Sequence, residues 1–144
     1  MIKIEYPSYQ PKIKGESNKE FIFDEVRKQW LILTPEEWVR QNFLQYLMQV
    51  MQYPASLIAV EREIKLGELK KRFDIVVFDK DSKPWMIVEC KEMNVALDTV
   101  VLNQVLRYNQ VLQVPFLVIT NGSNTVAYST ANNELTALLE LPDF

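Results

Sequence analysis

The chain has 144 residues, 48% of them hydrophobic and 24% charged, which are the proportions of an ordinary single globular domain with a sizeable core. A net charge of −3 argues against strong nonspecific binding to nucleic acid, and the absence of histidine excludes Ser-His-Asp and Cys-His catalysis. One cysteine cannot form an internal disulfide, and no apolar stretch resembles a signal peptide or a membrane span, so we expect a cytoplasmic protein without membrane contact.

The N-terminal part of the chain is polar. Residues 1–19 contain prolines and a glycine, and we expect a loosely ordered lead-in there, followed by one domain over residues 20–144. Residues 20–33 alternate weakly between apolar and polar side chains, which indicates a short hairpin or strand pair.

A first helix is predicted to begin after residue 34. Thr34 is a good N-cap, Pro35 fits the first helical position, and Glu37 falls at the third, which together predict a capping box. Apolar residues then recur at helical spacing as far as Val50, and Tyr53–Pro54 ends the pattern. The helix is therefore expected to bury one face.

Strand patterns fill most of the remaining chain. We expect strands over residues 57–66, 71–79, 85–90, 115–120 and 126–129. A second helix is predicted over 95–113, and a terminal helical turn within 133–141. The order α-β-β-β-α-β-β indicates one α/β sandwich, in which helices flank a mixed sheet. The helix between the third and fourth strands predicts that these two are parallel neighbours or near-neighbours.

Charged residues stand at the ends of two of these apolar strands. Asp74 lies early in RFDIVVF, while Glu89 and Lys91 end WMIVECK. Residues two apart in a strand share a face, so Glu89 and Lys91 point together and Cys90 points away. Buried charges must be paired or bound to a metal, and without histidine the ligands would be oxygens, which favours Mg²⁺ or Mn²⁺.

These residues suit hydrolysis by a metal-bound water. Asp74 and Glu89 could supply carboxylate oxygens to one Mg²⁺ ion, and the backbone carbonyl of Cys90 could supply a third oxygen. The metal would acidify a water, and Lys91 could orient that water or stabilise charge on a phosphate oxygen. An ion-pair network across the strands is the alternative interpretation of the same side chains.

Basic residues precede the acidic cluster. Lys70, Lys71 and Arg72 lie just before Asp74 in the sequence. They could bind the phosphate backbone of DNA as it approaches the metal, or they could form a solvated hairpin edge whose charges discourage aggregation. Both interpretations stay open at this point.

The succession of motifs resembles a known family. The pattern D…ExK is similar to that of the PD-(D/E)xK nuclease superfamily. The segments TPEEWVRQNFLQYL, IAVEREI, KRFDIVVFD, VECK, LNQVLRYN and ITNG follow one another as in the N-terminal nuclease domain of type I restriction endonuclease R (motor) subunits. The resemblance implies a restriction-endonuclease-like fold, Mg²⁺ dependence and cleavage of DNA phosphodiester bonds.

The resemblance also implies roles for individual residues. Asp74 and Glu89 match the metal-binding acids, and Lys91 matches the catalytic lysine. Gln104 and Tyr108 match the Gln-x-x-x-Tyr motif of the second helix. Because they lie four residues apart, they share a helix face and both could reach the site.

The family also offers a catalytic glutamate from the first helix. Glu36 and Glu37 are both candidates in this chain. We expect Glu36 to take the role, because its spacing from Val39 and Phe43 places it on the buried stripe. Glu37 has a structural role available in the capping box.

The motor of the family is not expected here. No phosphate-binding GxxxxGK[ST] pattern occurs, so we expect no ATP site in this polypeptide, which would be a stand-alone nuclease-like protein or a fragment. DNA is the expected partner, with a protein partner or a homodimer as further candidates. The alternative function is a catalytically silent module that keeps the nuclease fold and binds DNA or a protein.

Overall fold

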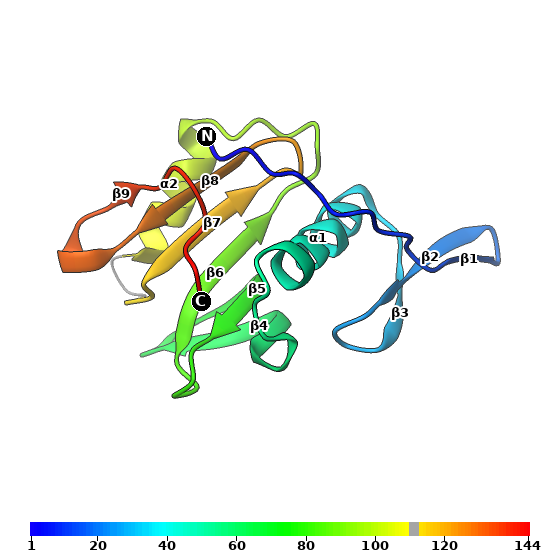
Figure 1. Ribbon diagram of the computed structural model, residues 1–144, viewed down its shortest axis with the longest axis horizontal. Helices are drawn as coiled ribbons and strands as arrows, with labels where there is room; N and C mark the ends of the chain where they lie inside the picture. Colours follow the sequence, from blue (N-terminus) through cyan, green and yellow to red (C-terminus); the bar gives the residue numbers. More distant parts are fainter. Residues whose placement is uncertain (110–112) are drawn as a thin grey trace.

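The computed structural model describes residues 1–109 and 113–144, except for the side chains of Leu66, Leu69, Val105, Leu106, Tyr108, Asn109 and Asn133. A small sheet is formed by β1 (Ile13–Glu16), β2 (Lys19–Asp24) and β3 (Gln29–Ile32), paired antiparallel in that order. It lies at one end of the molecule, beyond α1 (Figure 1). The pairing of β2 with β3 confirms the hairpin predicted for residues 20–33.

A larger sheet forms the body of the molecule. Its order is β4-β5-β6-β7-β8-β9, with bounds Ile58–Leu66, Leu69–Phe78, Pro84–Cys90, Phe116–Thr120, Thr125–Ser129 and Thr136–Ala137. β6 and β7 are parallel, and α2 (Thr99–Asn109) connects them, whereas the other neighbours are antiparallel. This confirms the mixed sheet and the parallel pair that a crossover helix predicts.

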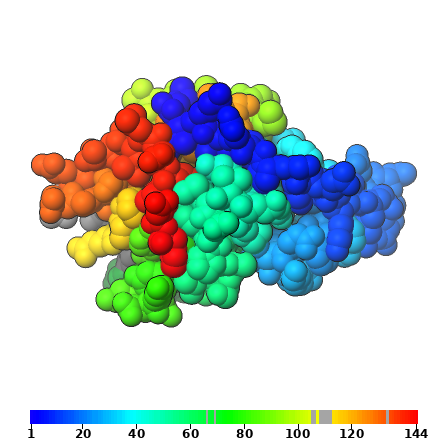
Figure 2. All heavy atoms as spheres, viewed as in Figure 1, coloured from blue at the N-terminus to red at the C-terminus, as the bar shows by residue number. Residues whose placement is uncertain are grey.

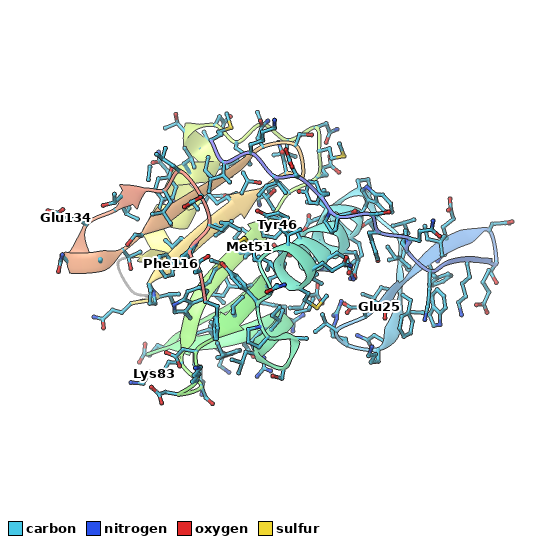
Figure 3. All side chains as sticks on the ribbon, viewed as in Figure 1. Glu25, Tyr46, Met51, Lys83, Phe116 and Glu134 are labelled. Atoms are coloured by element: carbon cyan, nitrogen blue, oxygen red, sulfur yellow. The ribbon has the colours of Figure 1, made fainter. Side chains whose placement is uncertain are left out.

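The two faces of this sheet are covered by different helices. α1 (Pro35–Gln45) and the π-helical turn after it (Tyr46–Val50) lie in front of the sheet in Figure 1, and α2 lies behind it. The larger of two hydrophobic cores lies between α1 and the sheet, and its helical side chains include Phe43, Leu44 and Leu47. Tyr46 and Met51, which Figure 3 labels, lie in the same core or against it. A smaller core on the α2 side contains Val76, Ile87, Leu117 and Ile119. The alternation of these side chains along each strand is what divides the two cores.

The N-terminal segment is packed rather than loose over part of its length. Ile2 is 5% exposed and pairs with Thr125 as an isolated bridge. The Tyr6 hydroxyl donates a hydrogen bond to the carbonyl of Gly122 at 2.9 Å. In Figure 2 this segment, in dark blue, lies against the body of the molecule. Apolar side chains among the polar residues of 1–19 account for this difference from the expectation.

The helix ends also differ from the predictions. The backbone N–H of Glu37 donates to the Thr34 hydroxyl at 3.0 Å, which confirms the N-cap, but the Glu37 carboxylate binds Arg40 instead of closing a capping box. α2 begins at Thr99, later than predicted, because the Asp98 side chain caps it.

Two further points concern the C-terminal half. Of the predicted second helix, residues 110–112 lie outside the described residues. The predicted terminal helical turn over 133–141 is wrong, because Ala131–Asn133 forms a 3₁₀ turn and β9 follows it, adding a short strand to the sheet edge. Across the described ranges, no helix combines the length and apolar character that a membrane span requires.

Candidate active site

Asp74 lies where β5 and β6 separate. The last ladder pair at this end joins Ile75 to Val88, so the next residues outward, Asp74 and Glu89, stand opposite each other. Oδ2 of Asp74 accepts a hydrogen bond from the backbone N–H of Cys90 at 2.8 Å. The negative charge of Asp74 also raises the pKa of Glu89, so the two carboxylates lie close enough to interact. The two predicted acids therefore come together at the open end of these strands.

β4 is distorted at the same level. Its ladder with β5 omits Glu61 and Asp74, and Glu61 has a φ of 50°, a left-handed conformation that residues other than glycine rarely adopt. Ile75 packs in the core beneath α1, whereas Phe73 packs in the core on the α2 side. Regular alternation would put residues 73 and 75 on one face. The hairpin therefore changes face at Glu61 and Asp74, which turns both carboxylates toward α1.

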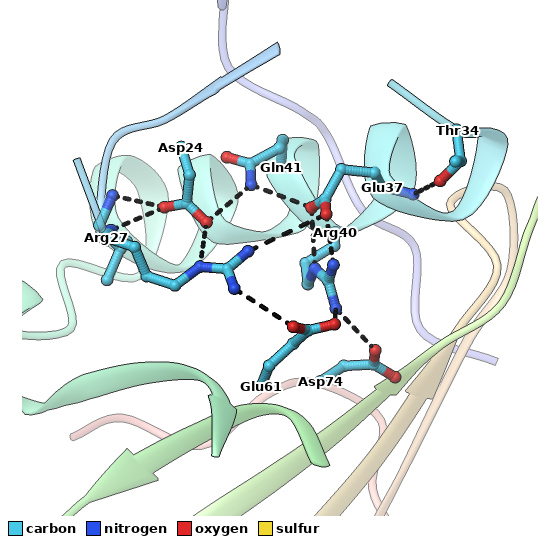
Figure 4. A network of polar contacts seen from close by, with 9 residues as sticks. Asp24, Arg27, Thr34, Glu37, Arg40, Gln41, Glu61 and Asp74 are labelled. Carbon is cyan, nitrogen blue, oxygen red and sulfur yellow. Dashed lines mark hydrogen bonds and ion pairs between the residues drawn. The ribbon is translucent and has the colours of Figure 1, made fainter. Parts of the chain in front are cut away.

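A largely buried polar network surrounds this distortion, and Figure 4 shows it from close by. We call it the Arg40 network, and its members are Asp24, Arg27, Glu37, Arg40, Gln41, Glu61 and Asp74. They come from β2 and the turn after it, from α1, and from the distorted parts of β4 and β5. The network thus joins the small sheet, the helix and the main sheet at one place.

Arg40 is the centre of this network. Its side chain is 7% exposed, and its Nη1 donates to Oδ1 of Asp74 at 3.0 Å and to Oε1 of Glu61 at 3.2 Å. Its Nε donates to Oε2 of Glu37 at 2.8 Å, and its Nη2 donates to the other oxygen of the same carboxylate. Glu37 and Arg40 lie three residues apart on α1, a spacing at which helical side chains are neighbours.

Glu89 contrasts with the carboxylates of this network. Its side chain is half-buried, and its Oε1 has no hydrogen-bond partner among the described residues. Burial, followed by the negative charge of Asp74, raises its pKa to about 7, although Lys71 and Lys91 act in the opposite direction. A buried carboxylate oxygen without a partner is costly, and a cation is the partner that would satisfy it.

Asp74 shares this electrostatic environment. Burial raises its pKa, while the Cys90 N–H and the charges of Arg40 and Lys91 lower it. The half-buried Lys91 therefore influences both Asp74 and Glu89. Cys90 itself is buried in the core beneath α1, which confirms that it points away from Glu89.

Glu36 extends the acidic group from the start of α1. Partial desolvation and the charge of Asp74 raise its pKa, and Lys91 lowers it. The expectation that Glu36 lies on the buried stripe was wrong, because Glu36 is exposed and Glu37 is 5% exposed. Consecutive helical residues differ by about 100° in direction, so only one of the two can face inward. The catalytic role of Glu36 stays a prediction that its charge coupling to Asp74 supports.

These side chains fit a divalent cation held by two carboxylates and water. Within residues 1–109 and 113–144, no group of three or more His, Cys, Asp or Glu side chains is arranged to hold a metal. Magnesium often binds through one or two carboxylates and keeps several waters, so the opposed pair Asp74 and Glu89 suffices. The unpartnered Oε1 of Glu89 is the observation that supports the fit. The backbone carbonyl of Cys90 as a third ligand stays a prediction.

The basic residues before Asp74 divide between two sides. Lys71 is half-buried and acts on the pKa of Glu89, which places it near the site. Lys70 and Arg72 are exposed and alternate with it along β5, so they point the other way. Contact of any of these residues with DNA stays a prediction.

The predicted helical motif of α2 is not brought to the site by any described contact. Gln104 is exposed on α2, and the prediction for Tyr108 concerns a side chain outside those that the structure describes. Their roles therefore stay predictions from the family resemblance.

Some members of the Arg40 network were missed from the sequence. Asp24 is fully buried and accepts hydrogen bonds from the backbone of Val26 and Arg27, an Asx turn whose Asp-x-x-Arg spacing was a usable signal. Glu61 also belongs to the network, because it binds Arg27 and Arg40. No local pattern signals this pairing, because it depends on the left-handed backbone at Glu61.

The fold and the opposed acids at diverging strand ends define a restriction-endonuclease-like α/β protein. The chain is similar to the crystal structure of "a putative nuclease belonging to DUF820" from Anabaena variabilis ATCC 29413. The two share 12% sequence identity and a TM-score of 0.50, over 93% of this chain and 80% of that one. This likeness supports the predicted fold class.

The chain belongs to the family described as type I restriction enzyme R protein N terminus, whose family model matches residues 35–142. This confirms the resemblance found in the sequence motifs. A fragment of "a putative HsdR subunit of a type I restriction enzyme" from Vibrio vulnificus YJ016 shares 23% identity over 59% of this chain, with a TM-score of 0.43. The present chain covers 18% of that fragment. No curated protein matches the sequence.

Proposed function

We propose that this chain is a Mg²⁺- or Mn²⁺-dependent DNA phosphodiesterase, a nuclease domain of the type I restriction kind that acts in the cytoplasm and has no ATP site of its own. The observation that carries the proposal is the buried, unpartnered Oε1 of Glu89, opposite Asp74 and beside Lys91, in a chain of this family. The charge of Asp74 raises the pKa of Glu89, and such repulsion between two acids is unfavourable alone and favourable around a cation.

Each residue has a defined task in this proposal. Asp74 and Glu89 would hold the metal ion, which when bound would supply an acidified water and neutralise charge on the phosphate. Lys91 carries a positive charge that acts on both acids, so its ammonium group is suited to bind a phosphate oxygen or to orient the attacking water. Glu36, at the exposed rim, is suited to accept a proton or a further water contact.

Calorimetric titration of the full chain with Mn²⁺ tests the proposal, together with cleavage of plasmid and oligonucleotide DNA. We expect the parent chain to bind Mn²⁺ and to cut DNA, and Glu89→Gln to lose both properties. Glu63→Gln is the matched control, because Glu63 is an exposed residue of β4 and pairs with Arg72 in the ladder away from the site. If the parent chain binds no divalent ion, the proposal is wrong.

A second candidate is a catalytically silent module that binds DNA or a protein. It is favoured by one observation: both oxygens of Asp74 already have partners, Arg40 and the Cys90 N–H. This candidate predicts DNA binding without cleavage, with the steep dependence on salt that phosphate contacts produce. If the chain does not bind DNA at low salt, the remaining candidate partner is a protein, either another subunit or a second copy of this chain.

A further inference from the structure

We propose that Arg40 is a positioning residue for the metal site: its guanidinium group holds the Asp74 carboxylate in the orientation in which that carboxylate binds the cation. The inference rests on the proposed function, since it concerns the same site. It assigns to the first helix a task in addition to the glutamate that the family resemblance implies.

The contacts of Asp74 carry the first step. Its Oδ1 accepts from Nη1 of Arg40 at 3.0 Å, and its Oδ2 accepts from the Cys90 N–H at 2.8 Å. The side chain is 14% exposed, so water has little access to replace either donor. Each carboxylate oxygen has two lone pairs, so each keeps one for a metal. The two donors therefore fix the plane of the carboxylate without filling it.

The second step is that Arg40 is itself held in place. The two carboxylate oxygens of Glu37 accept hydrogen bonds from Nε and Nη2 of Arg40. Nε2 of Gln41 donates to Oε2 of Glu37 at 3.1 Å. The same Gln41 nitrogen donates to Asp24 at 3.1 Å, and Arg27 binds that carboxylate through its Nε at 2.8 Å. Because these contacts already restrict the Arg40 side chain, it loses little conformational entropy when it binds Asp74.

The third step is the balance of charge. The Arg40 network contains four carboxylates, those of Asp24, Glu37, Glu61 and Asp74, and two guanidinium groups. Nη1 of Arg40 lies between Glu61 and Asp74 and binds both. Without it, these two carboxylates would face each other with no cation between them, and their repulsion would turn Asp74 away from its present direction.

The inference predicts a specific effect on metal binding. Removing a group that orients a metal-binding carboxylate costs about 10- to 100-fold in metal affinity or activity. A residue that only supports the fold would lower the melting temperature but leave the affinity of the folded chain unchanged. Metal affinity measured well below the melting temperature therefore separates the two roles.

The experiment compares Arg40→Met with Arg27→Met in the full chain. Arg27 is the matched control, because it is a largely buried arginine of the same network and binds Asp24 and Glu61 but not Asp74. We expect Arg40→Met to raise the Kd for Mn²⁺ by about 10- to 100-fold and Arg27→Met to raise it by much less, because Arg27 supports the network but does not contact Asp74. Arg40→Lys should give an intermediate Kd, because lysine keeps the charge but lacks the fork.

Other results of this experiment would overturn the inference. An unchanged Kd in Arg40→Met, or an equal rise in both arginine variants, overturns the inference while the proposed function stands. If the parent chain binds no Mn²⁺, both are overturned. Should Arg40→Met fail to fold, Arg40→Lys decides, and a Kd equal to that of the parent chain overturns the inference.

Discussion

The carboxylates of the Arg40 network and that of the neighbouring Glu89 differ in whether they have hydrogen-bond partners. In the network, Asp24, Glu37, Glu61 and Asp74 each accept hydrogen bonds from fixed donors. At Glu89, one buried carboxylate oxygen has no partner among the described side chains and backbone groups. The difference teaches that the carboxylates of the network are satisfied by donors within the chain, whereas Glu89 is left with an oxygen that the proposed cation would satisfy.

The largest effect is expected at Lys91. Lys91→Met removes a positive charge beside the proposed cation site and should lower the rate of DNA cleavage by about 10²- to 10³-fold. Because Lys91 is not expected to bind the metal, titration with Mn²⁺ should give a Kd close to that of the parent chain. A complete loss of Mn²⁺ binding in this variant would contradict the division of tasks between Lys91 and the acids.

A second test disrupts the Arg40 network and leaves the proposed cation site at Glu89 intact. Glu37→Gln leaves the buried guanidinium of Arg40 without its forked partner and should lower the free energy of unfolding by about 3 kcal/mol. Glu36→Gln is the control, because Glu36 is exposed one residue away, and it should change stability by less than about 0.5 kcal/mol. Urea denaturation measures both values, and equal effects would show that burial of Glu37 does not matter.

Replacing Glu89 should stabilise the chain, in contrast to replacing Glu37. The pKa of the Glu89 carboxyl is about 7 in the folded chain against the ordinary value of 4.5, so the folded state binds the proton more tightly than the unfolded state. Stability without metal should therefore fall as the pH rises from 4.5 through 7. Allowing for partial exposure, Glu89→Gln should stabilise the chain by about 2 kcal/mol at high pH.

Thermal unfolding in a chelating buffer measures this effect. At pH values below the ordinary pKa of Glu89, the parent chain and Glu89→Gln should unfold at similar temperatures, because the carboxyl group is then neutral in both states. Added Mn²⁺ should stabilise the parent chain and not the variant. Destabilisation by Glu89→Gln at high pH would mean that the carboxylate already has a partner of its own.

The smallest effect concerns the approach of DNA. The charge of Lys71 lowers the pKa of Glu89, which places Lys71 near the site, whereas Lys70 is exposed and points to the other side of β5. Lys71→Ala should therefore reduce the salt slope of DNA binding by about 1, as expected for the loss of one phosphate contact, and Lys70→Ala should not. Equal slopes for the two variants would show that the side of β5 does not determine the contact.

The parts of the fold that follow from local patterns were predictable. Asp74 and Glu89 stand in strands whose apolar residues leave few alternatives, and Thr34 caps its helix as its position predicts. Spacing alone could not predict whether Glu36 or Glu37 faces inward, because both are adjacent in the helix to the side that carries the buried apolar residues. Which of them turns inward depends on Arg40, whose partners come from distant parts of the sequence.

The left-handed backbone at Glu61 marks the limit of prediction from sequence. Its neighbours in IAVEREI alternate like those of an ordinary strand, so nothing local signals the change of face. The change is stabilised by Arg27 and Arg40, which bind the two oxygens of Glu61. Contacts of this kind appear only after the small sheet and α1 have been placed against the main sheet.

The turn after β2 has a practical consequence for defining the smallest folding unit. Asp24 and Arg27 belong to that turn, and both precede residue 35, where the family match begins. A truncation made at the family boundary would delete them, exposing Gln41 and removing a partner of Glu61. The autonomous unit for expression, crystallisation or grafting onto another enzyme should therefore include the small sheet.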